Sequence, residues 1–309
     1  MQNLVLKAID PRQTIYWNKY MTNIGWKVEE INGILVFIRQ IKPFKHSLIK
    51  IQHAQGPVPL DEVDRIAKEH KALFVLIEPH CNGYSEKEYL EHGYRKSKLK
   101  TSFTSTRLID ISGDEKKIWE SFSESARRNI KKSEKNKLRI EHIYTKDQKD
   151  SKYFDMFYKL YKLLGNTRKF YVLSYEECYQ RYEAFKDGSL ISFAYEEGNP
   201  EPIAVVWFLY YNDILLYNHT GITQQGYHLL ANYLLVWEGI KQAKIINLTL
   251  FDFESIYDPR YPKENKKWIG YSEFKSRFHG EVVQYPHGWL KIYNIYYKML
   301  HLCFTLFSS

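Results

Sequence analysis

Cysteine is scarce and scattered in this sequence. Only 3 cysteines occur, Cys81, Cys178 and Cys303, and no two of them form a C-x-x-C pair. This spacing excludes a zinc knuckle and the disulfide framework of a small secreted domain. The N-terminus also lacks a charged segment followed by a long apolar run, as an export signal would have. Both absences favour a reducing, cytoplasmic location.

Long hydrophobic runs are missing as well, because no segment reaches the ~18 apolar residues that a membrane-spanning helix needs. The nearest candidate is the segment 289–307, which is rich in aromatic and aliphatic residues. It is interrupted by Lys291, Asn294, Lys298 and His301. We expect this segment to dock as a helix on the protein's own core, and the alternative is peripheral contact with the inner face of the membrane.

The motifs of several enzyme classes are absent. The sequence has no G-x-x-x-x-G-K-[ST] loop and no G-x-G-x-x-G, which excludes the common nucleotide-binding turns. It has no H-E-x-x-H and no close cluster of His and Cys, so neither a metal nor a bound cofactor is expected. Residues 272–275 match S-x-x-K, but the S-D-N and K-T-G partners of that hydrolase site are missing.

The chain has abundant material for a folded core. Of its 309 residues, 44% are hydrophobic and 16% aromatic, which excludes disorder and predicts two domains of ordinary size. Its formal net charge is +9, with 45 Lys and Arg against 36 Asp and Glu. This excess favours polyanionic partners such as RNA, diphosphate-bearing substrates or anionic lipid, although many basic proteins of this size are merely soluble.

The first half alternates short apolar runs with helical periodicity. Residues 34–38 and 73–77 read as buried strands, residues 61–70 as a helix between them, and residues 106–111 as a further strand. A long amphipathic helix is then predicted, because apolar residues recur every fourth position at Ile118, Phe122, Ala126 and Ile130.

The other faces of this helix are strongly basic. Residues 127–137 contain six positive side chains and one negative, among them Arg127, Arg128, Lys131 and Lys132. Such a run attracts phosphate groups through counterion release, without sequence specificity. On charge alone, the competing interpretation is a helix face exposed to water.

The second half repeats the α/β pattern. The wholly polar run 145–152 is interpreted as the junction between a first domain, residues 1–145, and a second, residues 146–289. Helices are predicted at 153–164, 175–185 and 227–244, and strands at 190–195, 203–210, 214–217 and 245–250. The order of elements recurs in both halves, although no sequence repeat is visible.

An ordered series of short motifs resembles Fem-type transferases. Residues 106–111 (TRLIDI) are similar to the family's T-x-x-x-D-L strand, and residues 125–135 to its R-x-x-I-K-x-A-x-K segment. The remaining matches follow in the family's order at 237–243, 251–254 and 274–280 (FKSRFHG), with upstream landmarks at 55–58 and 77–79. Glu254, Ser255 and His279 depart from the small residues or glycine of the family pattern.

The resemblance implies an α/β fold of two tandem GNAT-type acetyltransferase-like domains around a cleft. It also implies that residues 290–309 return to the first domain and that the coiled-coil arm of some members is absent, since no long heptad pattern occurs. The implied activity is transfer of an amino acid from aminoacyl-tRNA to the stem peptide of a nucleotide-linked or lipid-linked peptidoglycan precursor, by a monomer. The amino acid and its place in the interpeptide bridge stay open.

The resemblance also implies roles for individual residues. Attack of an amine on the aminoacyl ester creates an oxyanion, and Lys275 of the F-K motif is the expected cationic partner, with Phe274 shaping the same pocket. Asp252, at a predicted strand end, either orients the amine and accepts its proton or bonds its own backbone.

Four further residues are expected to bind the precursor. Lys19 and Arg168 are the expected partners of its diphosphate, with Met21 as a competing match for Lys19. Tyr84 and Tyr217 offer hydroxyls to its sugar or peptide. Each of these four has the alternative of being an ordinary surface or half-buried side chain. The basic residues Arg127, Arg128, Lys131 and Lys132 are the expected tRNA contacts.

Two other functions stay open at this point. A CoA-dependent N-acyltransferase uses the same fold, but residues 222–228 lack the [QR]-x-x-G-x-[GA] loop that binds the CoA pyrophosphate. A non-catalytic RNA-binding protein would also explain the basic helix and the many aromatic residues.

Overall fold

The structure is a computed structural model that describes residues 9–83, 85–262 and 266–294. The chain divides into two compact units. Unit 1 contains residues 105–283, and unit 2 contains the preceding residues from 5 to 104 together with those from 284 onward. Each unit has its own sheet and its own core.

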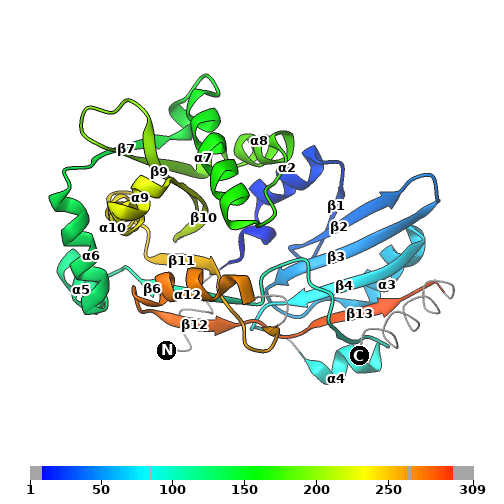
Figure 1. Ribbon diagram of the computed structural model, residues 1–309. Helices are drawn as coiled ribbons and strands as arrows, with labels where there is room; N and C mark the ends of the chain where they lie inside the picture. The colour runs from blue at the N-terminus through cyan, green and yellow to red at the C-terminus, as the bar shows by residue number, and fades with distance from the viewer. Residues whose placement is uncertain (1–8, 84, 263–265, 295–309) are drawn as a thin grey trace. The chain divides into compact units, whose positions relative to one another are not determined.

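Unit 2 is built on a mixed six-stranded sheet in the order β1-β2-β3-β4-β13-β5 (Figure 1). Its strands are β1 (Lys27–Ile31), β2 (Ile34–Ile41), β3 (His46–Ala54), β4 (Ala72–Pro79), β5 (Arg95–Ser97) and β13 (Gly288–Ile292). Its helices are η1 (Pro11–Gln13), α2 (Ile15–Asn23), α3 (Leu60–Glu69) and α4 (Glu86–Glu91). β3 and β4 run parallel, which requires the crossover that α3 supplies.

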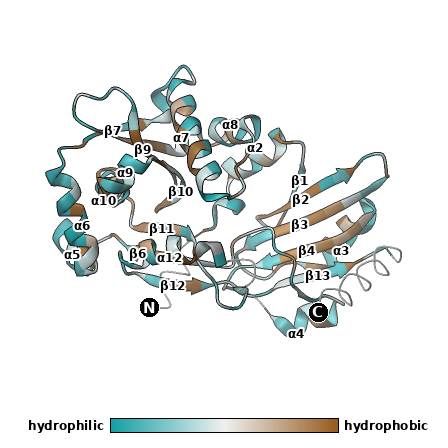
Figure 2. Ribbon diagram, in the orientation of Figure 1, coloured by the Kyte–Doolittle hydropathy of each residue, from teal (hydrophilic) through white to brown (hydrophobic). Residues whose placement is uncertain are grey.

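The core of unit 2 follows from the periodicity of its sequence. β2 and β3 bury β-branched residues such as Val36 and Ile49, and α3 buries Val63 and Ile66 against them. Figure 2 shows β2, β3 and β4, in the middle of this sheet, largely in hydrophobic colours. The strands predicted at 34–38 and 73–77 and the helix at 61–70 are confirmed.

Unit 1 is built on a seven-stranded sheet in the order β12-β6-β11-β10-β9-β8-β7 (Figure 1). Its strands are β6 (Ser105–Asp110), β7 (Arg139–Tyr144), β8 (Ser189–Tyr195), β9 (Pro202–Tyr211), β10 (Ile214–Ile222), β11 (Leu250–Ser255) and β12 (Glu281–Gln284). Its α-helices are α5 (Glu115–Ser121), α6 (Glu124–Lys135), α7 (Lys152–Arg168), α8 (Tyr175–Ala184), α9 (Gln224–His228), α10 (Ala231–Ile245) and α12 (Ile269–Ser276). Short 3-10 turns are η2 (Thr145–Asp147), η3 (Lys186–Gly188) and η4 (Lys266–Trp268).

Helices cover both faces of this second sheet. On β9, Trp207 packs against Phe157 of α7, with ring centroids 5.2 Å apart, whereas the next residue, Phe208, lies against Gly239 of α10. Successive side chains of a strand point to opposite faces, so α7 and α10 lie on opposite sides of the sheet. A Cβ added at Gly221 of β10 would lie 2.5 Å from the α7 backbone, so glycine is what permits this close approach.

The domain boundary predicted at residue 145 is not where the structure divides the chain. β6 pairs antiparallel with β11, so residues 105–145 belong to the same unit as the second half. The polar run 145–152 is also no junction, because buried Thr145 donates its hydroxyl to Lys186 O (2.5 Å) and α7 begins within the run. β13, which contains residues 290–292, pairs with β4 and β5 of unit 2.

The prediction of a single long helix through Ile118 and Ile130 is wrong, because the structure has two helices there, α5 and α6. Phe122 adopts an extended conformation with ψ 152°, and Ser123 caps α6 by accepting a hydrogen bond from Ala126 N (3.1 Å). The predicted apolar stripe is nevertheless buried throughout, since the two helices meet with their apolar faces on one core.

Two further sequence predictions are displaced. The helix predicted at 227–244 is divided between α9 and α10, because Leu230 between them has a left-handed backbone (φ 58°). The strand predicted at 245–250 lies later, at β11, because α10 continues to Ile245 before the turn that precedes the strand.

The helices of the described residues are all of moderate length. α7, with 17 residues, is as long as any helix in the part of the chain that the structure describes. Among those same residues, no helix is long and apolar enough to cross a membrane.

Candidate functional site

Lys275 lies on helix α12, and its side chain is completely buried. Its ammonium donates hydrogen bonds to the backbone oxygens of Phe253 and of Ser255, the latter at 2.8 Å. A lysine is rarely buried without partners, and these two carbonyls are the partners here. Lys275 is therefore held at the end of strand β11.

A break in strand pairing makes these carbonyls available. β11 pairs with β10 only as far as Asp252, opposite Leu216, and its register with β6 shifts between Asp252 and Ser255. Within this bulge Glu254 has a left-handed backbone (φ 57°). Oxygens that a regular ladder would use for β6 or β10 are therefore free to accept from Lys275.

Asp252 stabilises this bulge. The carboxylate oxygen Oδ1 of Asp252 accepts a hydrogen bond from the backbone N–H of Glu254 (2.6 Å) and another from the hydroxyl of Thr106. Asp252 is also within β11 rather than at its end, and it is buried. These contacts match the predicted alternative in which the carboxylate bonds its own backbone.

Aromatic rings surround the ammonium of Lys275. Nζ lies 3.7 Å from the ring centroid of Tyr271, 5.5 Å from that of Tyr217 and 5.9 Å from that of Phe253. Burial holds the pKa of Lys275 well below its usual value, while the nearby charges of Glu254 and Asp252 oppose this. An ammonium has three N–H donors, and within the described residues only two of them have oxygen acceptors.

Tyr217 follows directly on Leu216, the last residue of β10 that pairs with β11. Its side chain is buried, and its hydroxyl has no hydrogen bond of normal geometry within the described residues. Burial raises the pKa of Tyr217, and the side chain of Thr220 opposes this. A buried hydroxyl without a partner is costly, so this one is suited to receive a hydrogen bond from a ligand.

Arg168 is exposed at the C-terminus of α7. Its guanidinium lies 5.0 Å from the ring centroid of Tyr227 on α9, and Tyr227 in turn interacts electrostatically with Tyr217. The structure thus brings Lys275, Tyr217 and Arg168, predicted from separate parts of the sequence, to neighbouring positions in unit 1.

Phe274 faces away from this group. Its ring packs edge-on against Tyr233 of α10, with centroids 4.9 Å apart, and against Phe278 at 5.4 Å. These contacts anchor α12 to α10 and so hold the helix that carries Lys275. They do not include the rings around the ammonium.

Two of the predicted precursor-binding residues, Lys19 and Tyr84, are not part of the group around Lys275 in unit 1 as the structure describes it. Lys19 lies on α2 of unit 2 with an exposed side chain, whereas the competing match, Met21, is buried. Tyr84 lies outside the described residues.

The predicted basic surface lies on α6, where Figure 2 shows the helix in hydrophilic colours. A shallow hollow of about 480 Å³ is lined by Glu124, Arg127, Arg128, Lys131, Lys132 and Lys135. Of the four predicted residues, Arg128, Lys131 and Lys132 are exposed. Arg127 instead donates to Glu120 O (2.8 Å) and Phe122 O (3.0 Å), so it fixes the end of α5.

Sequence reasoning missed Tyr271, the ring nearest to the Lys275 ammonium. The signal was present, because Tyr271 precedes Lys275 by four residues and shares a helix face with it. Among the described residues there is no group of His, Cys, Asp and Glu able to hold a metal ion.

The departures from the family pattern coincide with unusual backbone. Glu254 and His279 both have a φ of 57°, a region that favours glycine. His279 is fixed there by a hydrogen bond between its ring Nδ1 and Ser121 O (2.7 Å). The family's glycine or small residues at these positions are explained by the backbone that the loop requires.

A family profile described as an acetyltransferase (GNAT) domain matches residues 120–276, slightly more than half of the chain. Among solved structures, the crystal structure of FemX superposes with a TM-score of 0.78 and 14% identity, covering 96% of both chains.

L-PGS from Bacillus licheniformis gives a TM-score of 0.59 at 10% identity, covering 95% of this chain and 96% of that one. The C-terminal domain of a putative lysylphosphatidylglycerol synthetase from Agrobacterium fabrum gives a TM-score of 0.58 at 11% identity. The match covers 92% of this chain and 90% of that one. A comparison with curated protein sequences gives no significant match. The likeness to FemX and the family match confirm the predicted fold, with two acetyltransferase-like units.

Proposed function

The chain belongs to the family of acetyltransferase (GNAT) domains, and from this membership we propose that it is an aminoacyltransferase. The proposed reaction moves an amino acid from aminoacyl-tRNA to the amine of the stem peptide of a peptidoglycan precursor. The fold shared with FemX over almost the full length of both chains supports this choice within a family of varied acyl transfers.

The observation that carries the proposal is the buried ammonium of Lys275. The substrate amine attacks the ester carbonyl, a C–N bond forms, and the carbonyl oxygen becomes an oxyanion. Lys275 has one N–H beyond those donated to Phe253 O and Ser255 O, and this N–H is the proposed partner of the oxyanion. When the ester C–O bond breaks, the ribose hydroxyl leaves with the proton that the amine loses.

Burial strengthens this role. An ammonium already fixed by two carbonyls needs little rearrangement when the negative charge develops, and the surrounding rings keep the local dielectric low. Asp252 then acts as a positioning residue, because it holds the bulge whose carbonyls fix Lys275. Phe274 positions the same helix from its other face.

The turn after β10 supports an aminoacyl donor over acetyl-CoA. Binding of a CoA pyrophosphate uses free backbone amides at the start of a helix. Here that helix, α9, has only 5 residues, and the amide of Gly226 already donates to the capping hydroxyl of Thr223 (3.1 Å).

Two basic regions fit the proposed substrates. The exposed cations Arg128, Lys131 and Lys132 of α6 are the proposed tRNA contacts. Arg168, beside Tyr217 and Tyr227, is the proposed partner of the precursor's diphosphate, and Lys19 and Tyr84 stay proposals for the same substrate.

The test is a transfer assay with purified protein. Separately charged tRNAs are incubated with a nucleotide-linked precursor, a lipid-linked precursor or phosphatidylglycerol. Phosphatidylglycerol is included because one similar structure is a domain of a putative lysylphosphatidylglycerol synthetase. We expect mass spectrometry to detect one added amino acid on a peptidoglycan precursor.

Two outcomes contradict the proposal. Acetylation of an amine by acetyl-CoA, with no aminoacyl transfer from any charged tRNA, identifies a CoA-dependent enzyme. Binding of tRNA with no transfer to any acceptor, unaffected by changes at Lys275, identifies an RNA-binding protein.

A further inference from the structure

The turn between β2 and β3 of unit 2 exposes an aromatic residue between lysines. Phe44 has 66% of its surface exposed, and Lys42, Pro43 and Lys45 around it are exposed as well. An exposed phenylalanine gains nothing from folding, because its ring stays in water. Its position in the turn between β2 and β3 allows the ring to contact an apolar phase outside the protein.

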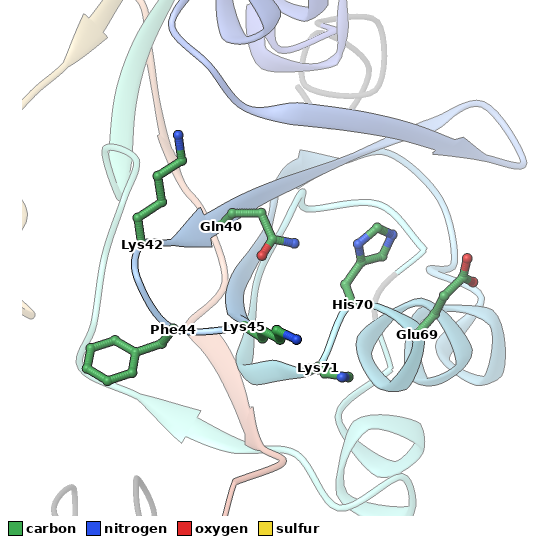
Figure 3. Close-up of a pocket in the computed structure, with 7 residues that line it drawn as sticks. All are labelled: Gln40, Lys42, Phe44, Lys45, Glu69, His70 and Lys71. Carbon is green, nitrogen blue, oxygen red and sulfur yellow. The ribbon is translucent and has the colours of Figure 1, made fainter.

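A hollow of about 400 Å³ lies beside this turn (Figure 3). It is lined by Gln40, Lys42, Phe44, Lys45, Glu69, His70 and Lys71, contributed by the β2–β3 turn and by the end of α3. Figure 3 shows the ring of Phe44 pointing away from the side chains of His70 and Glu69. The seven residues that line the hollow are together called the Phe44 surface.

The positive charge of the Phe44 surface is not neutralised locally. Its one carboxylate, Glu69, already pairs with Arg65 (3.0 Å), and His70 pairs with Glu29 (2.8 Å). Within the described residues, Lys42, Lys45 and Lys71 have no ion pair. Three ammonium groups thus remain for an external anion.

We propose that the Phe44 surface docks on an anionic lipid bilayer. The ring of Phe44 enters the boundary between headgroups and acyl chains, while the stems of Lys42 and Lys45 extend so that their ammonium groups reach the lipid phosphates. Lys71 adds attraction from the neighbouring edge of the hollow. This inference is independent of the proposed transfer reaction.

A bilayer fits the surface better than RNA does. Lysines alone suffice to hold an RNA backbone, and that binding does not require an exposed apolar residue in a turn. Bilayer docking uses both observations, since the ring supplies apolar burial and the lysines supply charge complementarity. The basic surface on α6, by contrast, has no exposed aromatic residue in its lining.

The experiment measures sedimentation of the full-length protein with vesicles of phosphatidylglycerol and phosphatidylcholine, and with phosphatidylcholine alone. The wild type should bind the anionic vesicles, and added salt should weaken binding. K42Q/K45Q/K71Q should lower the partition coefficient about a hundredfold, since each lysine contributes about fivefold. F44A should lower it about tenfold, and F44L should restore most of the loss.

Matched controls change the same chemistry elsewhere. K98Q/K146Q/K149Q removes three exposed lysines outside the Phe44 surface, and I15A truncates a side chain that is 78% exposed on α2. Both should bind the vesicles within twofold of the wild type, apart from a small effect of net charge.

Three results overturn the proposal. Binding to anionic vesicles that is unchanged in F44A and in K42Q/K45Q/K71Q excludes the Phe44 surface. Equal losses in K98Q/K146Q/K149Q reduce the effect to net charge. Loss of tRNA binding in K42Q/K45Q/K71Q, without loss of vesicle binding, makes the surface an RNA site. Transfer to a soluble acceptor should be unchanged in F44A. Failure of the docking proposal can therefore be distinguished from failure of the proposed transfer reaction.

Discussion

Replacement of Lys275 by methionine separates the chemical role of its ammonium from its structural role. Methionine has a similar unbranched shape and adapts to irregular space, so Lys275→Met removes the charge with little change in packing. Alanine is a poorer choice, because it would also leave a cavity beneath α12.

The effect of Lys275→Met on stability is the difference of two terms. The carbonyls of Phe253 and Ser255 lose their donor, which costs about 1 to 3 kcal/mol for each buried acceptor. The ammonium no longer has to be desolvated, which recovers several kcal/mol. We therefore expect a change in the free energy of unfolding of less than about 3 kcal/mol in either direction.

The effect of Lys275→Met on catalysis should be a large loss of rate. Loss of one oxyanion donor costs about 10² to 10³ in rate, equivalent to about 2.7 to 4 kcal/mol of transition-state stabilisation. The assay is aminoacyl transfer under saturating substrates, together with urea denaturation of the same preparation. Lys241→Met is the control, because Lys241 is a half-buried lysine of the same unit, paired with Glu238 (2.5 Å). It should retain wild-type transfer.

The pH dependence of stability provides a second readout on the same variant. Burial lowers the pKa of Lys275 in the folded chain below the ordinary 10.5, so the unfolded state binds more protons just below that pH. The free energy of unfolding of the wild type should therefore rise with pH over the range just below 10.5, relative to that of Lys275→Met. The comparison between the two proteins removes contributions from shared tyrosines.

Two results refute the reasoning about Lys275. Transfer by a folded Lys275→Met variant within a few-fold of the wild type would remove the ammonium from the mechanism. Identical pH profiles of stability for the two proteins would contradict the lowered pKa that burial gives Lys275 in the folded state.

Three other predictions concern the packing and electrostatics of the fold. Gly239→Ala should destabilise the protein by about 1 to 3 kcal/mol in urea titration despite the better helix propensity of alanine, because the new Cβ would lie 2.5 Å from the fully buried ring of Phe208. Ser123→Ala should lower the free energy of unfolding by about 1 kcal/mol, since Ala126 N loses its capping oxygen, whereas Ser123→Asp should preserve it. Burial lowers the pKa of His80 to about 4, so the unfolded state binds its proton first and up to about 3 kcal/mol of stability should disappear as pH falls from 6.5 to 4. A His80→Gln variant should lack this component in the same titration.

Strands and helices with strong periodicity were predictable from the sequence. Val63 and Ile66 recur at helical spacing, and the apolar runs on either side are too short and too β-branched for anything but buried strands. The break at Phe122 was not predictable from apolar spacing, because the two helices meet at an angle that keeps the same stripe on the core. Ser123, a favourable capping residue, was the local signal for it.

The division of the chain was not predictable from composition. The polar run around Thr145 has the character of a linker, but one buried hydroxyl and a β7–β8 ladder hold it inside unit 1. The true change of unit near residue 105 carries no compositional mark, because it occurs at the start of a strand that pairs with β11, far along the chain.

The sequence predicted which residues form the site better than it predicted how they are arranged. The ordered motifs pointed to Lys275, and the structure places Tyr217 beside it, while Arg168 contacts Tyr227, which interacts electrostatically with Tyr217. The burial of the ammonium depends on two backbone oxygens that a strand bulge releases, and a bulge leaves little trace in side-chain periodicity. The environment that gives Lys275 its proposed role could therefore not be predicted from the sequence.

The position of β13 between β4 and β5 sets an order on folding during synthesis. Among the described residues, unit 1 is the continuous stretch 105–283, so the ribosome delivers this stretch before β13 is made. β4 and β5 are translated earlier but stay unjoined until β13 arrives to pair with both. Unit 2, although it starts first, is therefore the later of the two to close, and a nascent chain must protect those two strand edges in the meantime.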